Sequence, residues 1–316
     1  MAAILLALAA CQPSERRVGW ECIAPANPGG GWDLTCRSVA NVLADLAIAP
    51  GAVRTLNLPG AGGGVAYAHA VGRREGDGAV LVAASPATTL RLAQRQYGHL
   101  TERDVRWMGA VAAEYGVIAV AADAPWRSLG DLMAAWRIDP SAVVASGGSA
   151  VAGQDHMKLL LLAREAGIDP RRVRYVPFDG GGEAMTAVLG GFVDVFSGEA
   201  SEVEGQIAAG NLRFLAILAP ERQEGAFASI ATAREQGFDV VWVTWRGFYV
   251  PEGLPEERYA RWAADLERMG SSPEWERTLA NYRLRPFLMV GSEFESFVLE
   301  QVEDFRALST ELGLLR

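Results

Sequence analysis

The sequence predicts an α/β protein of two lobes, with two mostly parallel sheets and a ligand cleft between the lobes. Three observations support this class. Apolar strand-like runs alternate with glycine-rich loops and helix-like segments, which is the pattern of βα units. Four of the glycine-rich loops follow strands, at the edge where open α/β sheets bind ligands. The length of 316 residues exceeds the size at which one core usually stops growing.

The first part of the chain contains strand patterns separated by two helix patterns. Apolar or alternating runs predict strands at 18–25, 53–58, 79–85 and 107–123. A helix is expected over 33–46, because apolar residues recur at helical spacing and Asp33 is a suitable N-cap. A second helix is expected over 65–74, directly after the next glycine loop.

A helix capped by Ser128 begins the second part of the chain. The units after it alternate in type, with strands expected at 142–147, 173–178, 193–197 and 212–218 and helices at 154–167, 183–191 and 202–210. The segment 238–251 contains two strand-like runs. The chain is expected to end in helices near 255–270, 274–281 and 292–312.

The composition is that of a globular protein, with half of the residues apolar and 21% charged. The net charge of −9 and the lack of a basic stripe argue against binding to nucleic acid.

Residues 1–17 are expected to be a lipoprotein signal peptide and a short linker. The start "MAAILLALAAC" is an apolar segment that ends in small residues and is too short to span a bilayer. The run from Leu8 to Cys11 fits a bacterial lipobox, in which Cys11 would be lipidated and the protein anchored outside the cytoplasm. An ordinary cleaved signal or a misassigned start stays open, because no Lys or Arg precedes the apolar segment.

Cys22 and Cys36 then remain as an even pair, which in an exported protein predicts a disulfide. The bridge would brace the glycine loop between them from behind. Two small buried thiols are the alternative. No Cys or His lies at ligand spacing beside the pair, so no metal site is expected.

The glycine loops do not fit the nucleotide-binding fingerprints. The G-x-G-x-x-G pattern fails because Leu34, Val65 and Met185 occupy its last position in three of the loops. No P-loop is present, and Val151 replaces the last glycine of an esterase elbow. No cofactor is therefore expected.

Anion capture fits the glycine loops better. A glycine turn that enters a helix presents free backbone N–H groups at the positive end of the helix dipole, where a carboxylate binds. Neutral hydroxyls and amides would complete the hydrogen bonding, and the candidates are Ser85, Thr88, Ser149 and Gln154. For each loop taken singly, a tight turn with packing glycines stays open.

Candidate catalytic groups are scarce. His69 and His99 are expected to be structural, and His156 lies on the first turn of its helix, where it could reach a ligand. Asp33 and Asp155 could act as bases, but both are interpreted as N-caps. No nucleophile with an oriented base is recognisable, so the chain is not expected to be an enzyme.

Five stretches of the chain resemble the Bug-type substrate-binding proteins, the receptors of tripartite tricarboxylate transporters. They are "CIAPANPGGGWDLTCR", "NLPGAGGGVA", "DAPWRSLGDL", "GGSAVAGQDHMK" and "DVVWVTWRGFYVPEG". The cysteine pair and the "WRGFY" run resemble the branch that serves citrate-like tricarboxylates. The match covers nearly all of the chain from about Val18.

The resemblance implies a type II periplasmic binding protein that closes like a Venus flytrap. Residues 18–121 and 222–316 would form lobe 1, and residues 122–221 lobe 2. The implied ligand-binding positions in lobe 1 are Pro28, Gly29, Gly30, Gly31, Trp32, Asp33, Asn57, Pro59, Gly60, Ala61, Gly62 and Gly63. Those in lobe 2 are Ser149, Gln154, His156, Asp179, Gly180 and Gly181, and Arg246 would be a charge partner of the ligand or a hinge salt-bridge residue.

The implied function is that of a monomeric periplasmic receptor. It would capture a small di- or tricarboxylate and deliver it to the integral-membrane permease subunits of the transporter. A carboxylate sensor that acts on a membrane kinase, and an enzyme acting on carboxylic acids, are the alternatives.

Overall fold

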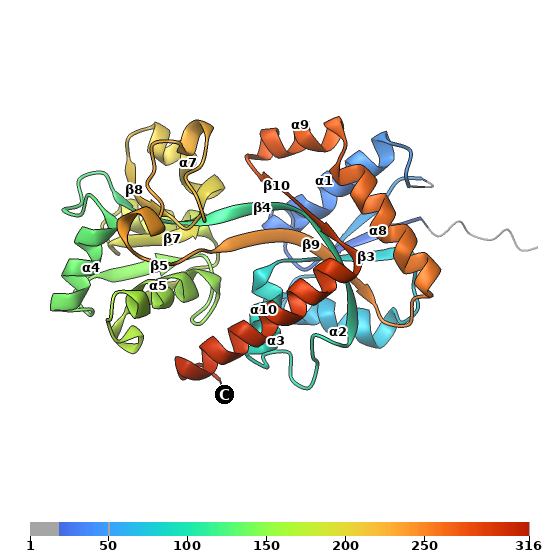
Figure 1. Ribbon diagram of the computed structural model, residues 1–316, viewed down its shortest axis with the longest axis horizontal. Helices are drawn as coiled ribbons and strands as arrows, with labels where there is room; N and C mark the ends of the chain where they lie inside the picture. The colour runs from blue at the N-terminus through green and yellow to red at the C-terminus, as the bar shows by residue number, and fades with distance from the viewer. Residues whose placement is uncertain (1–18, 50, 316) are drawn as a thin grey trace, which may run out of the picture.

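The protein consists of two lobes joined by long strands (Figure 1). The computed structural model describes residues 19–49 and 51–315, so the expected signal segment 1–17 and its lipidation site Cys11 lie outside the described residues. No helix in the described ranges is both long and apolar enough to cross a membrane.

The elements of the first 121 residues are strands that alternate with short helices. In chain order they are β1 (Glu21–Ala24), α1 (Gly31–Asp45), β2 (Arg54–Asn57), the 3₁₀ turn η1 (Ala61–Gly63), α2 (Gly64–Arg73), β3 (Val80–Ala84), α3 (Pro86–Ala93) and β4 (Val105–Ala121).

The same alternation continues in the middle of the chain. The elements are α4 (Leu129–Ile138), β5 (Val144–Gly147), α5 (Gln154–Glu165), η2 (Pro170–Arg172), β6 (Arg174–Pro177), α6 (Gly181–Leu189), β7 (Val195–Glu199), α7 (Ala200–Ala208) and β8 (Leu212–Ile217). The last part comprises η3 (Gly225–Phe227), η4 (Arg234–Gln236), β9 (Val243–Pro251), α8 (Glu256–Gly270), α9 (Pro273–Tyr282), β10 (Arg285–Val290) and α10 (Gly291–Glu311).

The strands form two sheet regions that share β4. The order is β2-β1-β3-β9-β4-β7-β5-β6, and β10 and β8 also pair with β4. We call the region of β2, β1, β3, β9 and β10 lobe 1 and the region of β6, β5, β7 and β8 lobe 2. The expected two-lobed α/β class is confirmed. The expectation of mostly parallel sheets is wrong, because every pairing made by β4 and β9 is antiparallel.

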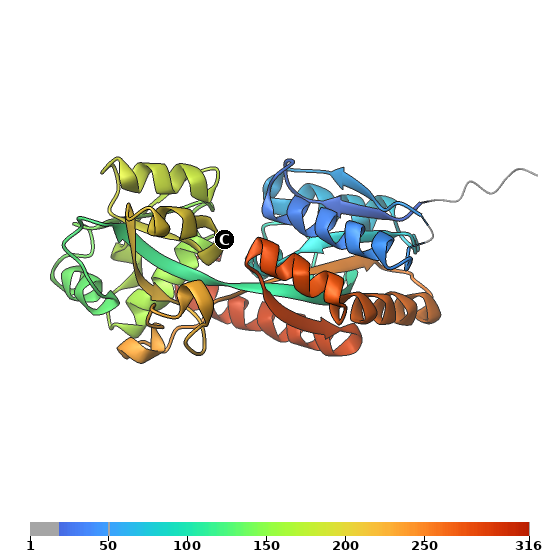
Figure 2. The same cartoon turned by 90° about the horizontal axis from the view of Figure 1, so that it is seen from above.

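The long strand β4 changes its partners in mid-course. Val105 to Tyr115 pair with β9, whereas Gly116 to Ala121 pair with β7 and β8. Figure 2 shows this strand running from one lobe into the other. The lobe limits at 121/122 and 221/222 stay a prediction. The strand β4 exchanges its partners at Gly116, a few residues before the first of these limits.

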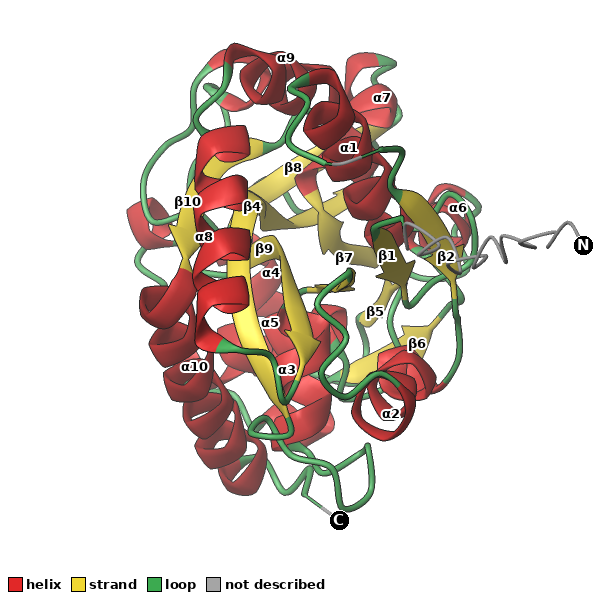
Figure 3. Ribbon diagram, turned by 90° about the vertical axis from the view of Figure 1, so that its right-hand side faces the viewer, coloured by secondary structure: helices red, strands yellow, loops and turns green. Residues whose placement is uncertain are grey.

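Two hydrophobic clusters pack on each sheet region. In lobe 1 one cluster lies beneath α1, α8 and α9 and the other beneath α2 and α10, and Figure 3 shows α8 and α10 beside β9 and β4. The largest cluster belongs to lobe 2, yet Trp242 and Leu312 pack in it. The chain after residue 222 therefore contributes to both lobes.

Two other expectations about the elements need correction. Only the second of the two strand-like runs in 238–251 forms a strand, β9. The first run does not, because the N–H of Val240 bonds to the nearby Phe238 carbonyl and that of Trp242 to the Leu218 carbonyl. The strand β10 was not expected. The apolar run from Phe287 to Val290 shows no alternation in the sequence, although the folded strand alternates between half-buried and exposed positions at its start.

The expected disulfide is confirmed between Cys22 of β1 and Cys36 of α1, with a Cα–Cα distance of 5.5 Å. Both residues are buried in the lobe 1 core. The bridge closes a ring over a sequence separation of 14 residues that contains the first glycine loop.

Replacing both cysteines by alanine (Cys22→Ala with Cys36→Ala) should lower the free energy of unfolding by about 3 kcal/mol, because the bridge restricts the unfolded chain. Urea denaturation measures this difference. Reducing agent should destabilise the wild type by a similar amount and leave the double variant unchanged. Equal stabilities of oxidised wild type and variant would contradict the bracing role.

Candidate ligand-binding cleft

A cavity of about 780 Å³ lies between the lobes and is lined by residues of both. The expected site residues that line it are Gly31, Trp32, Pro59, Gly60, Gly62, Ser85, Ser149, Gln154, Asp179 and Arg246. The expected residues that lie outside its lining are Pro28, Gly29, Gly30, Asp33, Asn57, Ala61, Gly63, Thr88, His156, Gly180 and Gly181.

The start of α1 forms one wall of the cleft. The helix begins at Gly31 with Gly30 as its N-cap, and glycine has no side chain that could cap it. Within the described ranges no hydrogen bond is made by the N–H groups of Gly31, Trp32 and Asp33. Helix N-termini of this kind attract anions through these N–H groups and the helix dipole.

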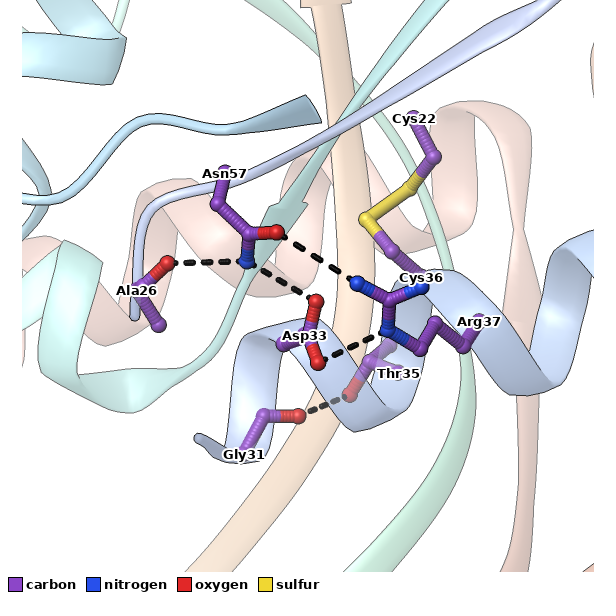
Figure 4. Close-up of a disulfide and its surroundings, with 8 residues drawn as sticks. All are labelled: Cys22, Ala26, Gly31, Asp33, Thr35, Cys36, Arg37 and Asn57. Atoms are coloured by element: carbon purple, nitrogen blue, oxygen red, sulfur yellow. Dashed lines mark hydrogen bonds and ion pairs between the residues drawn. A yellow bond between two sulfur atoms is a disulfide. The ribbon is translucent and has the colours of Figure 1, made fainter. Parts of the chain in front are cut away.

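Asp33 holds this loop from behind (Figure 4). Its carboxylate accepts hydrogen bonds from the Gly29 N–H at 2.9 Å, the Asn57 amide at 2.8 Å and Arg37 Nε at 2.9 Å. The bond to Arg37 is the main reason why the pKa of Asp33 falls to about 2, so Asp33 stays ionised. Asp33 is the third helical residue rather than the expected N-cap, because the helix begins two residues earlier.

The second glycine loop completes this wall through left-handed backbone. Gly62 (φ 60°) and Gly63 (φ 99°) adopt conformations that favour glycine. A Cβ on Gly63 would lie 2.9 Å from the Tyr97 hydroxyl, which donates to the Gly62 carbonyl at 2.7 Å. The indole N–H of Trp32 donates to Ser85 Oγ at 3.2 Å and links the loop of α1 to α3.

The loop before α5 forms the opposite wall. Ser149 Oγ accepts a hydrogen bond from the Asp155 N–H at 3.0 Å, and Gln154 lines the cavity beside it. His156 lies beneath the loop, where its Nδ1 accepts from the Ala152 N–H at 3.0 Å. Burial lowers the pKa of His156 to about 4, so the ring is neutral at pH 7. Its contact is with backbone rather than with a serine hydroxyl.

The loop before α6 packs against a carboxylate of the protein itself. A Cβ on Gly181 would lie 2.4 Å from Glu202 Oε1, and one on Gly148 would lie 2.3 Å from the Gly181 nitrogen. Glycines are therefore required here for close packing. Glu202, at the start of α7, lines the cavity and is exposed to it.

Glu202 sits in an environment that disfavours its ionisation. Its Oε2 accepts a hydrogen bond from the Glu199 N–H at 2.8 Å. Protein surrounds the carboxyl on its other sides, and this burial, together with the charges of Asp155 and Glu199, raises its pKa to about 7 in spite of Lys158.

A buried ion network lies beneath the cleft at the point where β4 changes partners. Lys158 is fully buried, and its ammonium donates to Asp155 at 3.0 Å, to Glu199 at 2.8 Å and to the Gly198 carbonyl at 2.8 Å. Burial lowers the pKa of Lys158, but the two carboxylates more than offset it and the pKa is raised. Asp155 is thus a counter-ion of Lys158 and not the expected N-cap, a position that Gly153 occupies.

Arg246 of β9 lines the cleft and, through Glu114, is connected to α7 of lobe 2. Its guanidinium forms an ion pair with Glu114 of β4 and donates to the Gly31 carbonyl at 3.0 Å. Glu114 also accepts a hydrogen bond from Ser201 of α7. Arg246 therefore lines the cavity and serves as a salt-bridge residue at once.

Several cavity residues were not expected from the sequence, and those with polar or charged side chains are Asn27, Arg91, Glu114, Glu199, Glu202 and Thr244. Two of them carried a sequence signal: Glu114 is a lone charge inside a long apolar run, and Glu199 lies two residues beyond the strand expected at 193–197. The sequence around Glu202 gave no sign that it lines a cavity, because a polar residue at this position of a helix pattern is expected on the surface. In the part of the chain that the structure describes, no three acidic, His or Cys side chains are grouped so as to hold a metal ion.

Comparison with known families identifies this architecture. Residues 37–314 match the model of TctC, the tripartite tricarboxylate transporter family receptor. The chain belongs to this family. The TctC-type receptor described here is also 25% identical to the protein BugT of Bordetella pertussis over 297 residues, which cover 93% of this chain and 89% of BugT.

Solved structures share the fold of this receptor. R. palustris Rpa4515 with adipate superposes with a TM-score of 0.80 at 18% identity, covering 93% of this chain and 97% of that one. MatC from Rhodopseudomonas palustris with bound malate gives a TM-score of 0.75 at 19% identity, covering 92% and 98%.

Replacing Lys158 by methionine should destabilise the receptor by about 3 kcal/mol or more, because two buried carboxylates then lack their cation. Chemical denaturation measures the loss. The control is Arg164→Met on the same helix, whose ion pair with Glu311 is exposed and should contribute less than about 1 kcal/mol. Equal stabilities of the two variants would show that the network is not stabilising.

The contribution of Glu202 to the stability of the ligand-free receptor should fall as the pH rises from about 4.5 to about 7. The folded state binds the proton of Glu202 more tightly than the unfolded state, whose pKa is near 4.5, so the protonated form favours folding. Glu202→Gln should therefore raise Tm at about pH 8 and leave it nearly unchanged at about pH 4. Thermal denaturation at both pH values checks this, and an identical Tm difference at both would contradict it.

Proposed function

We propose that this receptor captures a small carboxylate in the cleft and delivers it to the integral-membrane permease subunits of a tripartite tricarboxylate transporter. The observation that carries the proposal is the uncapped start of α1 at the wall of a cavity of about 780 Å³. Its N–H groups offer a carboxylate hydrogen bonds and a favourable dipole without a competing side chain.

The expected binding residues divide into two groups in this proposal. Gly31, Trp32, Ser85, Ser149 and Gln154 line the cavity and contact the ligand directly or through water. Asp33, Asn57 and His156 hold the loops in place from behind.

The range of ligands is that of small carboxylic acids. Solved relatives contain adipate and malate, which are both dicarboxylates. The citrate-like tricarboxylate expected from the sequence belongs to the same range and is one member of the ligand panel below.

Closure of the lobes around the ligand would use β4 and β9 as the connection. The two proposed moving units are residues 18–121 with 222–316 and residues 122–221, with the parts around Trp242 and Leu312 packed on the second unit. Because only differential binding favours the closed state, ligand affinity and closure are linked. The receptor acts as a monomer in the periplasm, either anchored at Cys11 or released by cleavage of the signal.

A receptor role is favoured over an enzymatic one by the surroundings of His156. This imidazole accepts from backbone at Ala152, and Ser149 Oγ accepts from the Asp155 N–H, so neither activates the other. An enzyme would consume the bound acid. Chromatography of the recovered ligand after long incubation tests this directly.

A thermal-shift screen of the purified chain tests the proposal. The panel contains citrate, isocitrate, malate, succinate, adipate and monocarboxylates, with phosphate and nucleotides as controls. A ligand at about 100 times its Kd should add about 2.7 kcal/mol to the unfolding free energy. A shift with phosphate or nucleotide alone would overturn the proposal.

Gly30→Val should weaken carboxylate binding at least about tenfold and leave the fold intact. A Cβ at Gly30 would lie 3.0 Å from Ala26 Cβ and 3.2 Å from the Asn27 carbonyl, so the loop must shift away from its ligand geometry. Calorimetric titration measures the affinity. The control is Gly72→Val, where a side chain meets nothing within 4 Å. Unchanged affinity in the Gly30 variant would remove this loop from the site.

A further inference from the structure

The two walls of the cleft carry opposite chemistry. The lobe 1 wall presents the N–H groups of α1 and the guanidinium of Arg91. The lobe 2 wall presents the carboxyl groups of Glu199, Glu202 and Asp179. A ligand held between the lobes meets donors on the lobe 1 side and, on the lobe 2 side, these carboxyl groups beside the hydroxyl of Ser149 and the amide of Gln154.

The cations near the lobe 2 wall are already engaged. Arg246 is paired with Glu114, so these two charges cancel. Lys158 is buried beneath the wall and shared by the carboxyl groups of Asp155 and Glu199, so it is not available to a ligand. In the described part of the chain no cation pairs with Glu202 or Asp179.

Acceptor atoms on this wall also lack partners. Glu199 is 6% exposed and Glu199 Oε2 makes no hydrogen bond in the described ranges, while its Oε1 accepts from Lys158 and from Thr244. Gln154 Oε1 is likewise buried without a partner. A buried acceptor without a donor is costly, so a donor group of the ligand would be favourable there.

We infer that the carboxylate bound by this receptor also carries a protonated nitrogen, and that Glu202 and Glu199 hold this nitrogen while the carboxylate lies at the start of α1. The inference rests on the proposed function for the carboxylate end and adds the identity of the other end. It makes Glu202 a specificity-determining residue.

A second carboxylate in the same place would face like charges. The groups around Glu202 are Glu199 at the end of β7 and Asp155 and Lys158 of α5, and α6 contributes only the backbone of Gly181. A diacid could bind there only if Glu202 were protonated. An amine is favoured by the ionised form, so the two ligand classes respond to pH in opposite directions.

Matched pairs of ligands test the inference. The pairs are γ-aminobutyrate with succinate, δ-aminovalerate with glutarate and ε-aminocaproate with adipate, titrated calorimetrically into the full mature chain. At about pH 8 the best amino acid should bind at least about tenfold more tightly than its diacid. Its advantage should shrink toward about pH 5, as Glu202 takes up a proton.

Variants test whether Glu202 causes the preference for the amino acid over the diacid. Glu202→Gln should abolish the preference for the amino acid and remove its pH dependence. The control is Glu183→Gln, an exposed carboxylate on α6 outside the cavity lining, which should leave both unchanged. The pH series on the wild type is an independent readout if Glu202→Gln does not fold.

The possible failures are distinguishable. Diacids that bind more tightly than every amino acid at both pH values would overturn the inference and leave the carboxylate receptor standing. If neither class binds, and no other carboxylate binds in the thermal screen, the proposed function itself is overturned.

Discussion

The architecture depends on one strand, β4, that forms hydrogen-bonded pairs in both sheet regions. β4 pairs with β9 and β10 up to Tyr115 and with β7 and β8 from Gly116 onward. Every backbone group along this buried strand needs a partner, so the exchange must occur at one defined residue. Gly116 fits that position because a Cβ there would lie 2.9 Å from the side chain of Lys158. The lobes are thereby joined by one continuous strand.

Four of the buried charged side chains, Glu114, Asp155, Lys158 and Glu199, lie at this junction. Lys158 reaches from α5 to the end of β7, and Thr244 of β9 donates to the same Glu199 oxygen. Glu114 of β4 and Arg246 of β9 form a second ion pair, on the lobe 1 side of this network. Buried pairs of this kind contribute little net stability, but each becomes expensive when one partner is lost. These ion pairs therefore hold the walls of the cleft in a defined position relative to the connecting strands.

The four glycine loops have different physical roles although they look alike. In "NPGGGWD" the glycines leave the start of α1 uncapped, and Asp33 supports the loop from behind. In "FDGGGEA" the glycines let α6 approach the Glu202 carboxylate and the backbone of Gly148. The first loop leaves backbone N–H groups at the start of α1 without a capping side chain, and the last is already occupied by an acidic side chain. This difference gives the cleft its two unlike walls.

The sequence by itself determined the features that local chemistry controls. Helical spacing, the Ser128 cap and the Cys22–Cys36 pair were readable because each depends on residues close together in the chain. Only the tertiary structure decided that Asp155 serves Lys158 and that Glu202 lies against Gly181. Asp155 has the sequence position of a cap, and Glu202 that of a surface residue. Their roles come from contacts with strands and loops distant in sequence, and no local pattern encodes such contacts.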